Sequence, residues 1–286
     1  MRHKCVGLIG MTRWGFIASF ASAALLIGAS SASAQVSLGT ASSFSVLAGS
    51  AVTNTLVTVV GGNLGVSPGT AISGFPPGIV TPPGQIHSAS LVAAQAQVDL
   101  TAAYVAIVNT PATSDLTGID LGALVLPPGV YNFDSSAQLT GPLTLDAQGN
   151  PDAVFIFKIG STLTTASGSS VSVINGGSSC NVFWQLGSSG TLGTTTSFAG
   201  NIIAFTSITL NTGTSVSGRV LARNGAVTLA SSTVGGCTVG GGGNGGGGAP
   251  GDFSNIPTLS EWALAILIVL TGLVGFGFLR RTSTFR

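Results

Sequence analysis

The segment that decides the fold reads IIAFTSITLNTGTSVSGRVLA and spans residues 202–222. It holds two short apolar runs, Ile202-Ile203-Ala204-Phe205 and Val220-Leu221-Ala222, whose residue types favour β-strands. Between them lie the dipeptide Thr209-Leu210 and several Gly, Ser, Thr and Asn residues that are typical of turns. A unit of this length with two or three short strands is too short for a propeller blade and fits one coil of a β-solenoid.

The same unit recurs along the chain. The dipeptide Thr-Leu appears at intervals of 18, 29, 18 and 19 residues, as Thr144-Leu145, Thr162-Leu163, Thr191-Leu192, Thr209-Leu210 and Thr228-Leu229. We interpret the long interval as one coil with an insertion around residues 175–181. If these leucines stack inward, side-chain alternation turns the threonines outward as a ladder with a spacing of about 4.8 Å.

An apolar stripe on the outside of the coils predicts a covering helix. With Phe157, Trp184 and Ala204 inside, the stripe consists of Ile156, Phe183, Ile203 and Leu221. The cover is predicted at residues 88–108, where apolar side chains recur at helical steps: Leu91, Ala94, Val98, Ala102, Val105 and Val108. Pro111 marks the end of this helix. The turn-rich residues 35–86 before it are expected to form early coils and a cap.

The N-terminus has the pattern of a targeting segment. Arg2, Lys4 and Arg13 precede an apolar stretch at residues 14–29 and the small residues Ala32-Ser33-Ala34. These three parts are typical of a secretory signal peptide cleaved after Ala34, and an N-terminal membrane anchor is the alternative. The predicted organisation is a signal peptide at 1–34, a solenoid domain at 35–239 and a Gly-rich flexible linker at 240–255.

Residues 256–286 form a second targeting segment. Ile256-Pro257-Thr258-Leu259 and Trp262 precede an apolar stretch at 263–279, just long enough to span a bilayer, and a basic tail with Arg280-Arg281 on the cytoplasmic side. The pattern resembles the IPTL type of sorting signal, which exosortase-like membrane enzymes of Gram-negative bacteria process. It implies an exported protein that is membrane-anchored or at the cell surface, or released after sorting. A plain C-terminal anchor is the alternative.

Charge is scarce, because the chain has nine Lys and Arg and eight Asp and Glu, only 6% of its residues. This scarcity excludes the usual nucleic-acid-binding class, and 44% apolar content argues against disorder. Residues 35–250 keep nine charged side chains and a net charge of −3: Lys158, Arg219, Arg223, Asp99, Asp115, Asp120, Asp134, Asp146 and Asp152. The exported body therefore has a polar but nearly non-ionic surface.

Cysteine and histidine usage favours a structural protein. Cys180 and Cys237 remain after signal cleavage and predict one disulfide, worth about 4 kcal/mol in the chain-entropy model, with two free thiols as the alternative. Two cysteines and one histidine are too few for a typical zinc site. His87 is the only histidine of the body, and Asp115 and Asp120 are interpreted as loop acids rather than a glycosidase pair. We predict no enzyme, no metal and no cofactor.

Four separated motifs occur in order along residues 35–239: LGTASSFSVLAG at 38–49, GNLGVSPG at 62–69, PGVY at 128–131 and GRVLAR at 218–223. Together they resemble the ice-binding proteins of the DUF3494 type. This resemblance implies a right-handed, discontinuous β-helix of triangular section with a long helix packed alongside, in agreement with the mainly β reading above. It also implies that one flat face rich in Thr, Ser, Ala and Gly binds ice.

Ice offers no charge to attract, so rigid methyl and hydroxyl groups can hold ordered water as the ligand. Thr212-Gly213-Thr214-Ser215 and Thr165-Ala166-Ser167-Gly168 approach the T-A/G-x-T/N repeat of some family members. The candidate ice-binding residues are Thr144, Thr162, Thr164, Thr165, Thr191, Thr194, Thr196, Thr209, Thr212, Thr214 and Thr228. The sequence leaves open whether the Thr-Leu ladder or the row through Thr194 and Thr212 binds ice, because a register shift of one residue exchanges the two faces of a strand. The alternative function is a structural or adhesive solenoid of the cell envelope or biofilm matrix.

Overall fold

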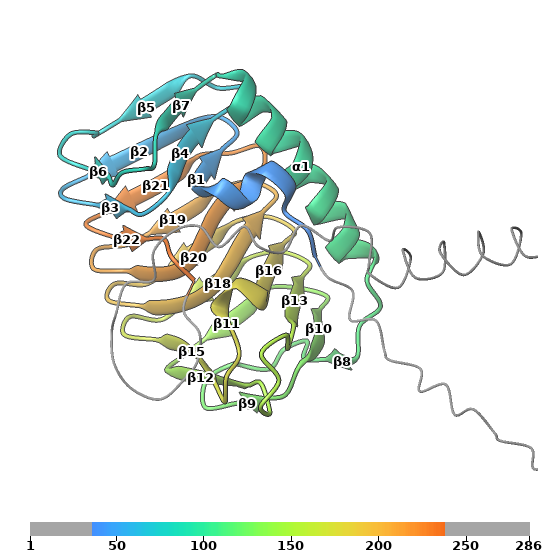
Figure 1. Ribbon diagram of the computed structural model, residues 1–286. Coiled ribbons are helices and arrows are strands. Elements are labelled where there is room, and N and C mark those ends of the chain that lie inside the picture. Colours follow the sequence, from blue (N-terminus) through green and yellow to red (C-terminus); the bar gives the residue numbers. More distant parts are fainter. Residues whose placement is uncertain (1–35, 238–286) are drawn as a thin grey trace, which may run out of the picture. The chain divides into compact units, whose positions relative to one another are not determined.

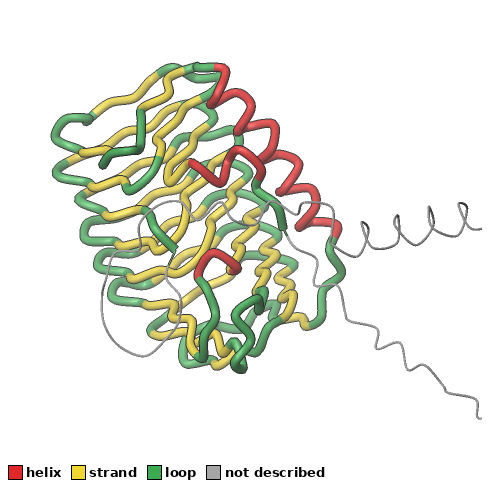
Figure 2. The backbone as a smooth tube through the Cα atoms, viewed as in Figure 1, coloured by secondary structure: helices red, strands yellow, loops and turns green. Residues whose placement is uncertain are grey.

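The computed structural model describes residues 36–237, a stack of short parallel strands with one long helix alongside (Figures 1 and 2). Each full coil contributes a strand to each of three faces. The mainly β solenoid with one packed helix is therefore confirmed. The predicted signal peptide (1–34), the linker (240–255) and the C-terminal segment (256–286) lie outside the described residues.

We name the three faces by what they carry. The threonine face consists of β11 (Ala137–Leu139), β14 (Leu163–Thr165), β17 (Gly190–Leu192), β19 (Ile208–Leu210), β21 (Val227–Ala230), β2 (Ala51–Thr55) and β5 (Ala71–Ser73). The helix face consists of β8 (Ser114–Asp115), β10 (Gly129–Phe133), β13 (Phe155–Ile159), β16 (Val182–Leu186), β1 (Phe44–Ala48), β4 (Asn63–Val66) and β7 (Ile86–Ser88). The third face consists of β9 (Val125–Leu126), β12 (Pro142–Asp146), β15 (Ser170–Ile174), β22 (Thr233–Val234), β3 (Val59–Val60) and β6 (Ile79–Val80). The long strands β18 (Ser197–Ala204) and β20 (Ser215–Ala222) start on the third face and continue onto the helix face.

The order of the coils in space differs from their order in the chain. The first strands stack on the last ones, because β1 pairs with β20 and β2 pairs with β21. Helix α1 (Leu91–Asn109) then runs along the stack, and the chain from β8 onward builds the remaining coils from the far end back (Figure 1). This confirms the expectation that the residues before the helix form early coils, and it makes the threonine face continuous across both parts.

The interior of the coils is filled by apolar side chains that alternate inward along each strand. All five leucines of the Thr-Leu dipeptides are buried there. On the inner side of the helix face, Tyr131, Phe157 and Trp184 follow one another in register, and the Phe157 and Trp184 rings stack with centroids 3.9 Å apart. The loop before β16 contains the short 3-10 helix η2 (Ser179–Asn181), at the insertion that the sequence predicts.

A second apolar cluster joins α1 to the outside of the solenoid. The predicted outward stripe of Ile156, Phe183, Ile203 and Leu221 is buried in this cluster. The 3-10 helix η1 (Gly39–Ser43) packs beside α1, and Thr40 donates two hydrogen bonds of 2.7 Å to Asp99 Oδ2. The hydroxyl of Ser90 caps α1 by accepting a hydrogen bond from the amide of Ala93. The prediction of a helix covering the stripe is therefore confirmed.

The predicted face of the helix is wrong. The buried residues of α1 are Ala93, Ala96, Leu100, Ala103, Tyr104 and Ile107, whereas Leu91, Val98, Val105 and Val108 are exposed. The helix is apolar on both sides, so periodicity fits two faces equally well. Three of the buried residues are alanines, whose small side chains allow the helix backbone to approach the sheet closely.

Candidate functional site

A straight ladder of polar side chains runs across the threonine face. Successive strands pair its outward residues in the order Gln138, Thr164, Thr191, Thr209, Thr228, Thr53 and Ser73. Thr209 is half-buried and the others are exposed. Neighbouring strands are about 4.8 Å apart, so five consecutive coils present a threonine at this repeat.

Two of the threonines predicted for this ladder lie elsewhere. Thr144 is in β12 on the third face, and Thr162 precedes β14, where its hydroxyl donates a hydrogen bond to Ser136 Oγ. Leu163 pairs with Gly190, and Thr164 pairs with Thr191. Each strand of this face has two inward positions around one outward position, and a leucine fits either of them. In β14 the leucine, Leu163, occupies the first inward position. The threonine before it, Thr162, therefore lies outside the ladder, and Thr164 takes the outward position.

Three other candidates are buried. Thr165, Thr196 and Thr214 are only 3%, 1% and 1% exposed, so their side chains cannot belong to a surface row. Thr165 fills the second inward position of β14, next to Leu139 of β11. Thr194 and Thr212 are exposed, in the turns that join the threonine face to the third face. We call this line of turns the corner.

A second row lies beside the ladder on the side toward the helix face. It occupies the positions two residues before the ladder and contains only small residues: Ser136, Thr162, Ser189, Ser207, Ala226, Ala51 and Ala71. Two of its serines also form hydrogen bonds with the backbone of the next coil. Ser189 Oγ accepts a hydrogen bond from the amide of Ser207, and Ser207 Oγ accepts one from the amide of Ala226. The two rows are about 6.7 Å apart along the strands.

Sequence reasoning missed part of the ladder. Thr53 lies beside Thr228, but Asn54 follows it where β17, β19 and β21 have leucine, so a search for Thr-Leu does not find it. Asn54 points inward and is 5% exposed, and its side-chain amide donates hydrogen bonds to the carbonyl oxygens of Leu56 and Gly74. Its Oδ1 has no partner within the described part of the chain. Residues Gln138 and Ser73 extend the ladder without being threonine.

Charged side chains avoid the threonine face. None of the nine between residues 36 and 237 belongs to its seven strands. Asp120 lies just beyond the β11 end of the sheet, where it forms an isolated bridge with Gln138. The seven strands of this face thus present small or polar side chains without charge.

The two acids that could suggest glycosidase chemistry each stabilise a turn. Asp115 Oδ1 accepts hydrogen bonds from the hydroxyl and the amide of Thr117, which lower the pKa of Asp115. Desolvation raises the pKa of Asp120, but the hydrogen bonds that Asp120 Oδ1 accepts from the amides of Gly122 and Thr140 outweigh it, so this pKa is lowered as well. A glycosidase acid needs a raised pKa. Within residues 36–237, no three His, Cys, Asp or Glu side chains gather as metal ligands would.

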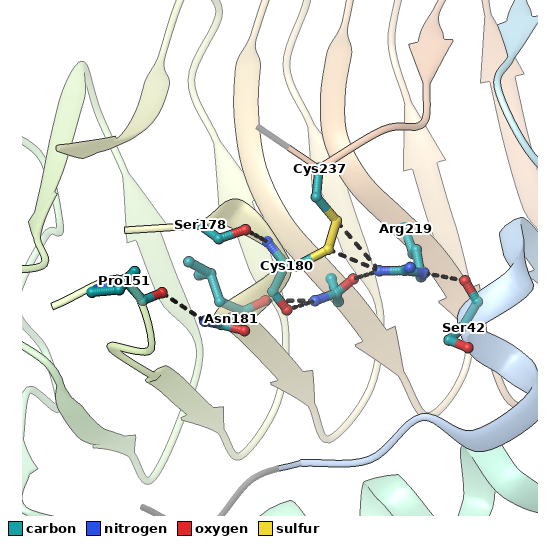
Figure 3. The surroundings of a disulfide bond; sticks show 9 residues. Ser42, Pro151, Ser178, Cys180, Asn181, Arg219 and Cys237 are labelled. Carbon is teal, nitrogen blue, oxygen red and sulfur yellow. Dashed lines mark hydrogen bonds between the residues drawn. A yellow bond between two sulfur atoms is a disulfide. The ribbon is translucent and has the colours of Figure 1, made fainter. Parts of the chain in front are cut away.

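The predicted disulfide between Cys180 and Cys237 is present, with Cα atoms 5.2 Å apart (Figure 3). It ties the end of the described chain to η2. Arg219 lies beside it, donating to Ser42 O, Asn201 Oδ1 and the two sulfur atoms. Burial lowers the pKa of Arg219. Both the bridge and Arg219 are remote from the threonine face and have a structural role.

Two sequence families match the chain. The ice-binding-like family matches residues 46–235, and the IPTL-CTERM motif matches residues 256–281. A protein of Nostoc sp. (strain HG1) named "Ice-binding protein" is 58% identical over 198 residues, which are 69% of this chain and 72% of that protein. "Ice-binding protein 1" of Shewanella frigidimarina is 36% identical over 227 residues, 69% of this chain, and the matched part is 25% of that protein.

A solved structure agrees with the fold. The crystal structure of an ice binding protein from an Antarctic biological consortium superposes with a TM-score of 0.70 and 44% sequence identity, covering 72% of this chain and 93% of that one. The chain belongs to the ice-binding-like family.

Proposed function

We propose that this protein is exported and binds ice through the threonine face. The observation that carries the proposal is the ladder in which Thr164, Thr191, Thr209, Thr228 and Thr53 stand side by side in five consecutive coils. Bound to the crystal surface, such a protein inhibits ice growth or recrystallisation. The names of its relatives support this assignment.

The chemistry of the face suits water in a crystal as its ligand. Threonine has a methyl and a hydroxyl group on a side chain with restricted χ1, so both groups are held in place before binding. Hydroxyl groups can contact ordered water at a small entropic cost. Long charged side chains, which lose more rotamer freedom when fixed, are absent from the seven strands of the face.

The third face is a poorer candidate. Its outward row begins with Pro142 and ends with Val59 and Ile79, and Ile79 is 50% exposed. Only four small hydroxyl-bearing residues lie in register between these ends: Ser170, Ser197, Ser215 and Thr233. Asp146 adds a charge at the end of β12. The helix face is covered by α1. On the threonine face the small, uncharged side chains continue in register over six strands, from Thr164 of β14 to Ser73 of β5.

The C-terminal motif supports export and sorting to the cell surface. We propose that Ile256, Pro257, Thr258, Leu259 and Trp262 are recognised by an exosortase-like enzyme of a Gram-negative bacterium while the apolar stretch 263–279 holds the chain in the membrane. Labelling of intact cells with an antibody to the solenoid tests this placement. A variant that lacks residues 256–286 should be missing from the surface and found in the medium.

An ice recrystallisation assay on residues 35–239 tests the proposed function. This part is chosen because it contains both apolar clusters, and because a crystallised relative is 93% covered by the match to this chain. Micromolar protein should keep ice crystals small, and Thr191→Tyr and Thr209→Tyr should abolish the effect. Ala102→Tyr, on the exposed side of α1, is the control for the addition of a large side chain elsewhere on the surface. No effect of the unmodified protein on crystal size would favour the alternative, a structural or adhesive surface solenoid.

A further inference from the structure

A column of buried hydroxyl groups lies directly under the corner. Its members are Ser169, Thr196, Thr214, Ser232 and Thr58, which are 1%, 1%, 1%, 2% and 0% exposed. Each immediately precedes a residue of one in-register row on the third face: Ser170, Ser197, Ser215, Thr233 and Val59. The hydroxyl groups therefore stack from coil to coil inside the solenoid, parallel to the ladder outside it.

The central members of the column cross-link neighbouring turns. Thr214 Oγ1 lies 2.6 Å from Asn211 O in its own turn and 3.2 Å from Gly193 O in the next coil, and donates toward both. Thr196 Oγ1 is 3.0 Å from Thr165 Oγ1, which also accepts a hydrogen bond of 2.9 Å from the amide of Gly193. Three successive coils are joined in this way at the corner.

The ends of the column make the same kind of contact. Ser169 Oγ donates to Leu139 O and accepts from the amide of Gly141, both in the preceding coil. Thr58 Oγ1 accepts from the amide of Ser232 across the junction between the N-terminal and C-terminal coils. Buried hydroxyl groups are tolerated only when they are hydrogen-bonded, and here they satisfy backbone groups that turns leave unpaired.

These bonds end on the turns that carry exposed hydroxyl groups. Gly193 and Asn211 directly precede the exposed Thr194 and Thr212. On the outside, Thr194 Oγ1 donates a hydrogen bond of 2.8 Å to Ser167 Oγ of the neighbouring coil. The spacing of these outer side chains along the stack is thus set from inside as well as by the strand ladders.

We propose that the buried hydroxyl column consists of positioning residues, which hold the corner so that Ser167, Thr194 and Thr212 continue the ice-binding surface beyond the edge of the sheet. This inference rests on the proposed function of the threonine face. Thr196 and Thr214 act through the turns they brace and do not touch ice themselves. The threonine-rich repeat at residues 212–215 then has one exposed threonine for the surface and one buried threonine for its support.

The test replaces a buried hydroxyl by a methyl group of the same size. Thr196→Val and Thr214→Val should each require about tenfold more protein for the same inhibition of recrystallisation, the loss expected for about one hydrogen bond. The same variants should speed hydrogen exchange at the amides of Gly193 and Thr195 by about tenfold. Thr214→Ser keeps the hydroxyl and should retain activity. Ile159→Val, a buried change on the helix face, is the control for a general loss of stability.

The outcomes separate this inference from the proposed function. If the unmodified protein is inactive, the proposed function fails, and the inference fails with it. If it is active and the valine variants keep full activity, the positioning role is overturned, whatever the exchange rates show. Equal losses of activity in Ile159→Val and Thr214→Val would also overturn it. Loss in the valine variants alone, with rescue by Thr214→Ser and faster exchange at the corner, supports it.

Discussion

Thr53 and Thr228 are register partners in the parallel strands β2 and β21, although one lies near the start of the described chain and the other near its end. The ladder therefore crosses the junction between the N-terminal and C-terminal coils without a gap. We expect Thr53→Tyr to reduce ice recrystallisation inhibition as strongly as Thr191→Tyr, because both side chains face the same surface. Full activity of Thr53→Tyr would confine the binding surface to the C-terminal coils.

The chemistry of the ladder is tested at a single position. Thr191→Val keeps the methyl group and the shape of the side chain, and should retain most of the activity. Thr191→Lys adds a flexible charged chain that must be ordered on binding, at a cost of about 1.5–2 kcal/mol, and should reduce the activity about tenfold or more. Both variants should unfold near the temperature of the parent in a calorimetric scan. Equal activity of the lysine and valine variants would contradict a role for the uncharged surface.

Helix α1 offers a direct check of which side faces the solenoid. Leu100 is fully buried against the second apolar cluster, so Leu100→Ala should lower the free energy of unfolding by about 2–5 kcal/mol. Val98 is 63% exposed, and Val98→Lys should change it by no more than about 0.5 kcal/mol. Denaturant unfolding of the two variants measures both values. The reverse order of effects would restore the face that periodicity alone predicts.

The sequence predicts some features of this fold well because they depend on residue type. The outward stripe from Ile156 to Leu221 and the helix that covers it follow from counting alternate positions. The face of the helix does not, since apolar residues occupy both sides of it. The ladder was predicted only in part, because Leu163 and Thr165 both point inward and residue type alone does not say which of them matches Leu192. Which residue of β14 aligns with Leu192 of β17 is known only from the strand pairing in the structure.

Paired glycines mark the place where two long strands pass from the third face to the helix face. Gly200 and Gly218 are register partners in β18 and β20, and a Cβ atom on Gly218 would lie 2.1 Å from Gly200 O. Gly218 also has a φ of 152°, which other residues rarely adopt. We expect Gly218→Ala to lower the free energy of unfolding by about 3 kcal/mol or more, since backbone must move to admit the methyl group. Ser217→Ala, one residue earlier, is the control and should unfold like the parent in the same denaturant titration.

Acid should affect stability before it affects the ice-binding surface. Hydrogen bonds from the hydroxyl and the amide of Thr40 lower the pKa of Asp99 below its ordinary 3.8. A carboxyl group with a lowered pKa stabilises the fold above its unfolded pKa, and this contribution is lost as the pH falls through the folded value. The melting temperature should therefore decline below about pH 4, and less steeply in Asp99→Asn.

Ice recrystallisation inhibition should stay constant between about pH 5 and pH 9, because the seven strands of the threonine face contain no side chain that titrates in that range. The measurement is the protein concentration that halves crystal growth, taken at each pH under conditions where the protein is fully folded. A change of more than about threefold across this interval would mean that a titrating group contributes to the contact with ice. The surface would then have to extend past the seven strands of the sheet to a side chain that titrates within this interval.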